Sequence, residues 1–177
     1  TATFFKFYKE QMLLDNIQPN LVHTTLAQWE NNAQMGCIIT QNIDGLHSLA
    51  GSKKVIELHG TVNRNYCIKC HKWYPISYVK KFLTIPKCSC GGLVRPFVVL
   101  YGESLHDGVI EACYEALSKT DLLIVAGTGL TVSTASSVVS MFRGKYLVIL
   151  NNEPTSFDDR AHLVIRQDLF ELFKELT

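Results

Sequence analysis

Two strand-like segments of this chain end in side chains that could do chemistry together. The apolar run 37–39 is followed by four residues that can form hydrogen bonds: Thr40, Gln41, Asn42 and Asp44. A second run, 55–58, leads to His59, and the glycine after it allows a ligand or another backbone to approach closely. Ligands of open α/β sheets bind beyond the carboxyl ends of the strands. We therefore predict that an amide, a carboxylate and an imidazole line one pocket.

Four of the six cysteines have the spacing of metal ligands. They form two close pairs: Cys67 with Cys70, and Cys88 with Cys90. Two pairs of thiolates joined by a loop can fill the four vertices of a structural zinc site, and residues two apart in an extended segment point to the same side. We predict one closed zinc site with these ligands, and we place His71 behind them as an alternative. Cys37 and Cys113 lie in apolar patterns and are predicted to be buried free thiols in a reducing compartment.

Two later strand-like runs, 121–126 and 145–150, also end in turns that could hold a ligand. The first is followed by Gly127, Thr128 and Gly129, and the second by Asn151, Asn152 and Glu153. A strand, a glycine turn and a helix can present backbone N–H groups to an anion, although such turns are common in α/β proteins. Because polar turns follow three strands, one shared crevice explains them better than three unrelated loops.

Strands and helices alternate along most of the chain. The spacing of apolar residues predicts helices over 20–30, 109–118 and 132–142, and Asn20 can cap the first of them. The alternation predicts an α/β fold, a Rossmann-like parallel sheet with helices on both faces and a small inserted zinc-binding module. We place the larger domain at 1–65 and 91–177 and the zinc-binding module at 66–90.

Composition and charge argue against several classes of function. A formal net charge of +1 provides no basic excess for a phosphate backbone, which argues against general nucleic-acid binding. A zinc-ribbon nucleic-acid binder stays open because lysines gather around the cysteines, although charged runs are usually solvated faces. No apolar run approaches the length of a membrane span and the start does not resemble a secretory signal, so we expect a soluble, cytoplasmic protein. The lysines are Lys53, Lys54, Lys69, Lys72, Lys80, Lys81 and Lys87.

The segment TQNIDGLH at 40–47, followed by ELHG at 57–60, resembles the central signature of the sirtuins, the NAD-dependent protein-lysine deacylases. The resemblance implies NAD as cofactor, one structural zinc ion and an acyl-lysine protein or peptide as partner, with nicotinamide and an O-acyl-ADP-ribose as products. It implies that His59 is the general base on the ribose hydroxyls, which suits a histidine because its unperturbed pKa lies near neutral pH. The nicotinamide pocket would contain Asn42 and Asp44, and the ribose would be held by Gln41.

The resemblance extends to later segments. It assigns the turns 127–129 and 151–153 to the nucleotide and places 168–169 near the adenine. Gly129 stands where the family has serine, so a hydroxyl contact is lost while backbone contacts can persist. A strand edge with Tyr101 in place of phenylalanine is similar to the lip that clamps the substrate peptide through backbone hydrogen bonds. The residues of this lip are Val98, Val99, Tyr101, Gly102 and Glu103.

The family's opening glycine-rich phosphate loop has no match in this chain. We therefore expect the NAD-binding domain to be incomplete at its N-terminus, and the chain as a fragment to bind NAD poorly and to be inactive. Two alternatives stay open: a mono-ADP-ribosyltransferase, in which a protein side chain intercepts the activated ribose, and a non-catalytic module that binds NAD or a peptide. His23 matches a family position, and we assign it to packing because a histidine on such a helix is more often structural than catalytic.

Overall fold

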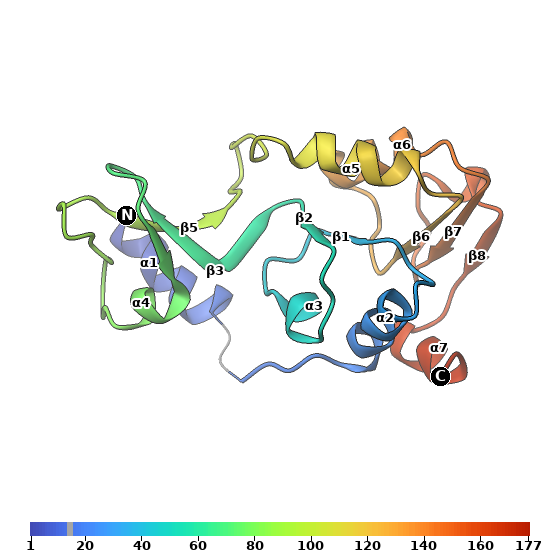
Figure 1. Ribbon diagram of the computed structural model, residues 1–177, viewed down its shortest axis with the longest axis horizontal. Coiled ribbons are helices and arrows are strands. Elements are labelled where there is room, and N and C mark those ends of the chain that lie inside the picture. The colour runs from blue at the N-terminus through green and yellow to red at the C-terminus, as the bar shows by residue number, and fades with distance from the viewer. Residues whose placement is uncertain (14–15) are drawn as a thin grey trace.

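Two parallel sheets form one half of the computed structural model, which describes residues 1–13 and 16–177 (Figure 1). Their strands are β1 (Ile38–Thr40), β2 (Val55–Glu57), β6 (Leu122–Ala126), β7 (Tyr146–Leu150) and β8 (Leu163–Ile165). Strand β1 pairs with β2, and the others pair in the order β6-β7-β8. The predicted parallel strands are confirmed to within a residue or so. They form two separate hydrogen-bonded ladders in the described part of the chain, where we expected a single sheet.

Helices cover both faces of the three-stranded sheet, as predicted. Alternate residues of a strand point to opposite faces. Leu147 and Ile149 of β7 therefore enter a buried cluster with α5 and α6, whereas Val148 and Leu150 contact the cluster of α2 and α7. These helices are α2 (Leu21–Asn31), α5 (Val109–Ser118), α6 (Ser133–Met141) and α7 (Leu169–Glu175). No helix in the described residues is long and apolar enough to cross a membrane.

Polar side chains cap the N-termini of α2 and α7, the two helices that cover one face of the three-stranded sheet. The Asn20 side chain accepts a hydrogen bond from the His23 amide, and the His23 ring accepts one from the Asn20 amide, which makes a reciprocal capping box. One oxygen of Asp168 accepts from the amides of Phe170 at 2.8 Å and Glu171 at 3.1 Å. The predicted cap at Asn20 is confirmed, and His23 takes part in it.

An antiparallel sheet of order β4-β3-β5 carries the cysteines and forms the other half of the molecule, at the left of Figure 1. Its elements are β3 (Gly60–Cys67), β4 (Trp73–Pro75), helix α4 (Ile76–Lys80) and β5 (Val94–Val98). Helix α1 (Ala2–Phe7) and the π-helix η1 (Tyr8–Met12) bury Phe5 and Tyr8 in the same cluster as Val79. The sheet extends on both sides of the positions 66 and 90 at which we placed the module boundaries.

The chain crosses from the parallel to the antiparallel sheet at His59 and Gly60. Gly60 has a φ of +72°, and a Cβ added there would lie 2.0 Å from the Phe97 carbonyl oxygen, so only glycine fits. The Val99 amide donates to the His59 carbonyl at 3.0 Å. His59 is thereby fixed between the two halves of the protein.

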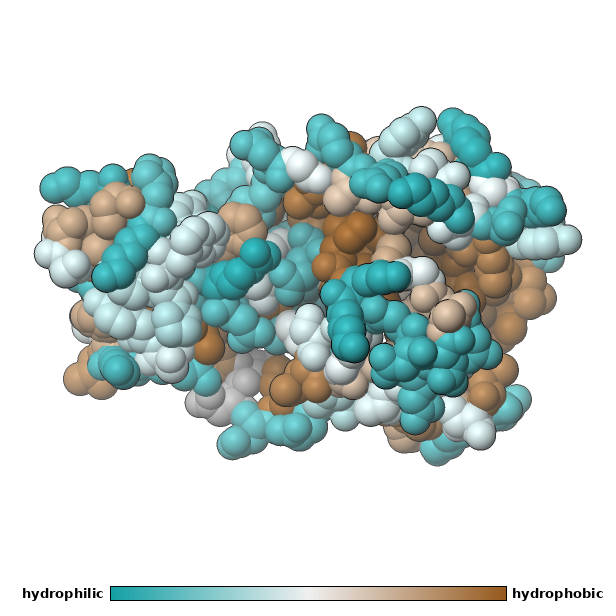
Figure 2. Space-filling model, viewed as in Figure 1, coloured by the Kyte–Doolittle hydropathy of each residue, from teal (hydrophilic) through white to brown (hydrophobic). Residues whose placement is uncertain are grey.

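Strand β6 exposes apolar side chains along the parallel region. Leu122 is 46% exposed and Ile124 is 42% exposed. Figure 2 shows apolar surface over this part of the molecule. One edge of β6 pairs with β7, and no other described strand pairs with it. An apolar edge of this kind can add a further strand.

Candidate active site

The His59 imidazole is held at both ring nitrogens. Nδ1 lies 3.1 Å from the Gln41 carbonyl oxygen, and Nε2 lies 3.1 Å from the Thr134 hydroxyl. A carbonyl can only accept, so this first bond requires a proton on Nδ1, whereas the Thr134 hydroxyl can donate to Nε2 or accept from it. The ring is therefore held in one orientation, with Nε2 directed at a hydroxyl that a substrate hydroxyl could replace.

Thr134 was missed by the sequence reasoning. It lies in the first turn of α6, directly after the glycine turn that follows β6. Its contact with His59 joins positions 75 residues apart. The only available signal was a hydroxyl in the helix turn that should face the crevice, and several neighbouring residues carry a hydroxyl as well.

The ends of β1 and β6 meet through Gln41 and Thr128. Gln41 Nε2 donates to Thr128 Oγ1 at 2.9 Å, and the same hydroxyl accepts from the Leu130 amide at 3.3 Å. Two of the predicted polar turns thus share one edge of the molecule. Because Gln41 also provides the carbonyl that binds His59, the predicted ribose residue and the predicted base are adjacent.

Asn42 and Asp44 lie on the loop between β1 and the short helix α3 (Leu46–Leu49). Asp44 Oδ1 accepts from the Leu46 amide at 2.8 Å, so one carboxylate oxygen caps that helix. The Asn42 side chain is exposed, and its amide donates to Thr40 Oγ1 at 3.0 Å. The loop follows Gln41 directly, and Gln41 is the residue whose carbonyl binds His59.

Two further imidazoles lie behind Asp44. The rings of His23 and His47 have centroids 4.8 Å apart. Burial lowers the pKa of both imidazoles, and the negative charge of Asp44 opposes this only in part. His47 Nδ1 is buried and has no hydrogen-bond partner among residues 1–13 and 16–177. The two rings are thus a neutral, packed support for the Asp44 loop.

A hollow of about 290 Å³ opens at the carboxyl ends of the three-stranded sheet. Gly127 borders it with a φ of +64°, and a Cβ there would lie 3.0 Å from Leu169 Cδ1. Gln167, which the sequence reasoning also missed, joins the predicted residues, whereas Thr128 and Gly129 do not line the hollow. The lining residues are Gly127, Asn151, Asn152, Glu153, Gln167, Asp168 and Leu169. The turns after β6 and β7 therefore meet at one cavity, whereas the turn after β1, which we expected in the same crevice, does not line it.

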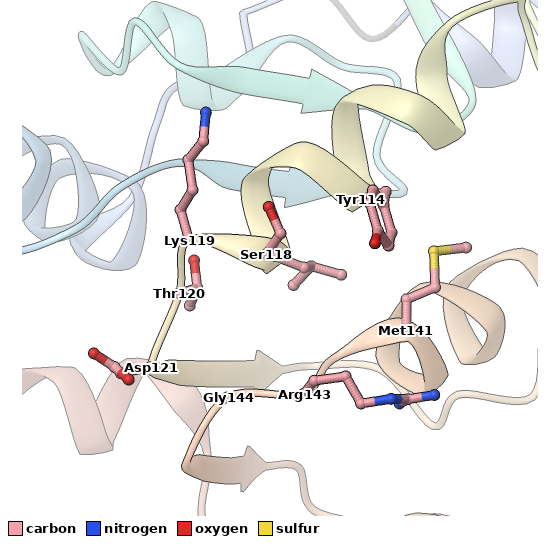
Figure 3. Close-up of a pocket in the computed structure, with 9 residues that line it drawn as sticks. Tyr114, Ser118, Lys119, Thr120, Asp121, Met141, Arg143 and Gly144 are labelled. Atoms are coloured by element: carbon pink, nitrogen blue, oxygen red, sulfur yellow. The ribbon is translucent and has the colours of Figure 1, made fainter.

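A larger hollow of about 460 Å³ lies at the opposite, amino ends of β6 and β7 (Figure 3). Its two cationic side chains, Lys119 and Arg143, are already engaged within the protein. Arg143 donates to the carbonyl oxygens of Ser140 and Phe142, and Lys119 pairs with Glu115. None of the predicted site residues lines it. We therefore place the candidate site at the smaller hollow and the adjoining His59 edge.

The four paired cysteines form one cluster. Their sulfurs all lie within 4.8 Å of one another, and the Sγ atoms of Cys67 and Cys90, and of Cys70 and Cys88, are 3.5 Å apart. Zinc–sulfur bonds of about 2.3 Å in a tetrahedron require sulfur–sulfur distances of about 3.8 Å, so the cluster fits a zinc ion. His71 is not a member of the cluster.

The surroundings of the cluster favour the thiolate of Cys88. Tyr74 donates its hydroxyl hydrogen to Cys88 Sγ at 2.9 Å and lowers the pKa of that thiol to about 5. A Cβ at Gly92 would lie 2.6 Å from Cys67 Sγ, so the glycine leaves room for the sulfur. The Tyr74 hydroxyl thus provides a hydrogen-bond donor to one sulfur, and Gly92 leaves space for another.

The predicted peptide lip lies at the edge strand β5 and the turn after it. Val98 is buried, whereas Tyr101 is fully exposed. Glu103 is bound by both guanidinium nitrogens of Arg95, at 2.6 and 2.8 Å, and by the Leu100 amide. Hydrogen bonding to Arg95 lowers the pKa of the Glu103 carboxyl to about 2. Glu103 therefore holds the turn in place and leaves Tyr101 free on the surface.

Parallel strands with helices on both faces, a polar edge at their carboxyl ends and a four-cysteine cluster define a Rossmann-like α/β protein with a metal-binding insertion. Residues 1–134 match the Sir2 family. An NAD-dependent protein deacetylase of Clostridium acetobutylicum is 47% identical over 171 residues, covering 96% of this chain and 70% of that protein. The one of Clostridium perfringens is 47% identical over 168 residues, covering 94% of this chain and 69% of that protein.

Solved structures give the same result. The structure described as "The Structural basis of Sirtuin Substrate Affinity" has a TM-score of 0.94 and 39% identity, covering 98% of this chain and 74% of its own. The one described as "Sir2-p53 peptide-NAD+" has a TM-score of 0.90 and 38% identity, covering 99% of this chain and 76% of its own. The chain belongs to the Sir2 family, and the resemblance noted in its sequence is confirmed.

Proposed function

We propose that this protein is an NAD-dependent protein-lysine deacylase, acting as a deacetylase, that releases nicotinamide and an O-acyl-ADP-ribose. The observation that carries the proposal is the His59 imidazole, bound through Nδ1 to the Gln41 carbonyl with Nε2 directed into the edge where the strand ends meet. Relatives named NAD-dependent protein deacetylase support the same activity. A cytoplasmic location accords with its free cysteines.

The residues of the edge suit NAD. A cavity of about 290 Å³ is close to the lower limit for ligand pockets, which fits the adenosine end of the molecule. The Gly127 amide donates to the Leu150 carbonyl at 2.9 Å, so Thr128 and Gly129 would offer the backbone N–H groups of the turn before α6, where an anion is favoured. Gln41, Asn42 and Asp44 would hold the ribose and nicotinamide. When bound, NAD supplies a ribose carbon that the acyl oxygen of the substrate attacks as nicotinamide leaves.

His59 would act as the general base. With its proton on Nδ1, the ring has a free electron pair on Nε2 that can take a proton from a ribose hydroxyl. The Gln41 carbonyl stabilises the imidazolium that forms, because it accepts the Nδ1 hydrogen bond in both protonation states. Thr134 holds Nε2 in place until the substrate hydroxyl replaces it.

The substrate peptide would bind along β5 and the turn after it. Strand β5 lies at the edge of its sheet, so backbone groups of an extended peptide can pair with it. We propose that Val98, Val99, Tyr101, Gly102 and Glu103 form this lip. The neighbouring structure described as "Sir2 bound to acetylated peptide" supports a peptide of this kind.

The cysteine cluster would hold one structural zinc ion. Four thiolate ligands close the coordination sphere, so the ion takes no part in the chemistry. It would stabilise the antiparallel sheet, because Cys67 and Cys88 are buried in the same cluster as its apolar core. The ligands are Cys67, Cys70, Cys88 and Cys90.

The test is His59→Ala in the full-length protein, assayed with NAD and an acetyl-lysine peptide. We expect deacetylation to be lost while zinc content and thermal stability stay unchanged. Normal NAD-dependent turnover by the variant would refute the role of His59. Mass spectrometry of the products decides between the alternatives: a modified target protein would favour mono-ADP-ribosyl transfer, and binding of NAD and peptide without any product would favour a non-catalytic module.

A further inference from the structure

Arg166 connects the turn after β7 to the short helix η2 (Asp158–Arg160). Its Nη1 donates to the carbonyl oxygens of Asn151 and Glu153, each at 3.0 Å, and its Nη2 donates to an oxygen of Asp158. The Arg166 side chain is 34% exposed. One planar guanidinium thus ties two carbonyls and a carboxylate together.

The carboxylate that anchors Arg166 is itself fixed. Asp158 accepts from the Thr155 hydroxyl at 2.8 Å and from the Thr155 amide at 3.2 Å. These bonds, and then Arg166, lower the pKa of the Asp158 carboxyl, which therefore stays ionised near neutral pH. The Arg166 guanidinium is therefore bound by a carboxylate that Thr155 holds in place.

Asn151 is the residue most constrained by this arrangement. Its amide donates to the Ile165 carbonyl at 3.2 Å, and its Nδ2 donates to the Glu153 carbonyl at 2.8 Å, the same oxygen that Arg166 binds. With Nδ2 engaged, Oδ1 is left as the acceptor of the side chain. Asn151 lines the hollow at the carboxyl ends of the strands, and Arg166 does not.

We propose that Arg166 is a positioning residue for the adenosine end of the nucleotide and that it acts through Asn151 without touching the ligand. The inference rests on the proposed function, which places a nucleotide in this hollow. Lysine cannot replace Arg166 fully, because an ammonium is a compact charge and cannot bind two carbonyls and a carboxylate in one plane. The residue sets affinity for the nucleotide and has no part in the reaction at His59.

Calorimetric titration with ADP-ribose tests the proposal in the full-length protein. We expect Arg166→Ala to weaken ADP-ribose binding about tenfold, which corresponds to about 1.4 kcal/mol, and Arg166→Lys to weaken it less. Arg160→Ala is the matched control, since Arg160 lies over the Phe157 ring at 5.3 Å on the same loop. The control should bind ADP-ribose within twofold of the unmodified protein, and a tenfold loss in it would contradict a specific role of Arg166.

A double-mutant comparison shows whether Arg166 positions Asn151 or contacts the nucleotide directly. In an Asn151→Ala background, Arg166→Ala should change ADP-ribose affinity less than twofold, because the group through which it acts is gone. Amide hydrogen exchange at Phe157 and Asp158 should rise in Arg166→Ala, since the loop is released. A tenfold loss that persists in the Asn151→Ala background, or unchanged exchange in the loop, would overturn the inference. If the unmodified protein binds no ADP-ribose, both this inference and the proposed function fall.

Discussion

The ion pair between Arg95 and Glu103 allows a quantitative test, with Glu103→Gln as the perturbation. Both guanidinium nitrogens bind the carboxylate, at 2.6 and 2.8 Å, and the Leu100 amide donates to it at 3.0 Å. Glutamine keeps the shape of the side chain but has one acceptor oxygen and no charge. The change therefore removes the charge-assisted part of the contact that holds the predicted peptide lip.

The magnitude follows from the pKa of Glu103. The difference between its ordinary value near 4.5 and about 2 corresponds to about 3 kcal/mol if the pair were shielded from water. The Glu103 side chain is 38% exposed, so solvent screening reduces this to about 1–1.5 kcal/mol. The pKa is lowered in the folded state, so the stabilisation is complete above about pH 4.5 and is lost as the pH falls toward 2.

Urea unfolding of the two proteins measures the effect. At pH 7 Glu103→Gln should lower the free energy of unfolding by about 1–1.5 kcal/mol, and the difference should shrink once the pH falls below about 4.5. The control is Glu115→Gln, because the pair of Glu115 with Lys119 is more than 70% exposed and solvent screening should make its contribution clearly smaller than that of Glu103. Two results would contradict a stabilising ion pair between Arg95 and Glu103. One is an equal loss of unfolding free energy in the two variants at pH 7, and the other is a loss in Glu103→Gln that stays constant down to pH 3.

Two further predictions concern the metal and the helix pair α2 and α7. Chelation should release about one zinc ion per chain, and Cys67→Ser should lower the zinc content. Either change should raise amide exchange in β3, β4 and β5 while β6 to β8 stay protected, because the sheets have separate cores. Unchanged exchange in β3 to β5 would contradict a structural metal. Phe173→Ala should cost about 3–5 kcal/mol in urea unfolding, since the ring is 2% exposed and stacks on Trp29 at 5.5 Å. Phe170→Ala, at 41% exposure, should cost less than about 1 kcal/mol, and similar losses in both variants would contradict the packing.

The parallel strands could be predicted because each combines a short apolar run with an abrupt polar end. Leu122–Ala126 and Tyr146–Leu150 carry this signal locally, and so does the Asn20 cap, which depends on neighbours within three residues. The cysteine cluster was equally readable, since ligand spacing along the chain limits which sulfurs can share one ion. These features depend on residue type and short-range geometry.

Other features depend on contacts between distant segments, which a single sequence does not encode in its local pattern. The extent of the antiparallel sheet depends on the pairing of β3 with β5, where Gly60 lies opposite Val98. The Thr134 contact with His59 joins two different elements. Arg166 is one of many exposed cations in the sequence, and only the fold brings it to the carbonyl of Asn151.

The position of His59 at the crossing between the two sheets ties the proposed base to the mechanics of the molecule. Strand β3 begins at the next residue, and the amide of Val99, the residue after β5, donates a hydrogen bond to the His59 carbonyl. A rotation of the cysteine-bearing half about this residue would therefore change the distance between the imidazole and the Gln41 carbonyl, and with it the orientation of the proposed base.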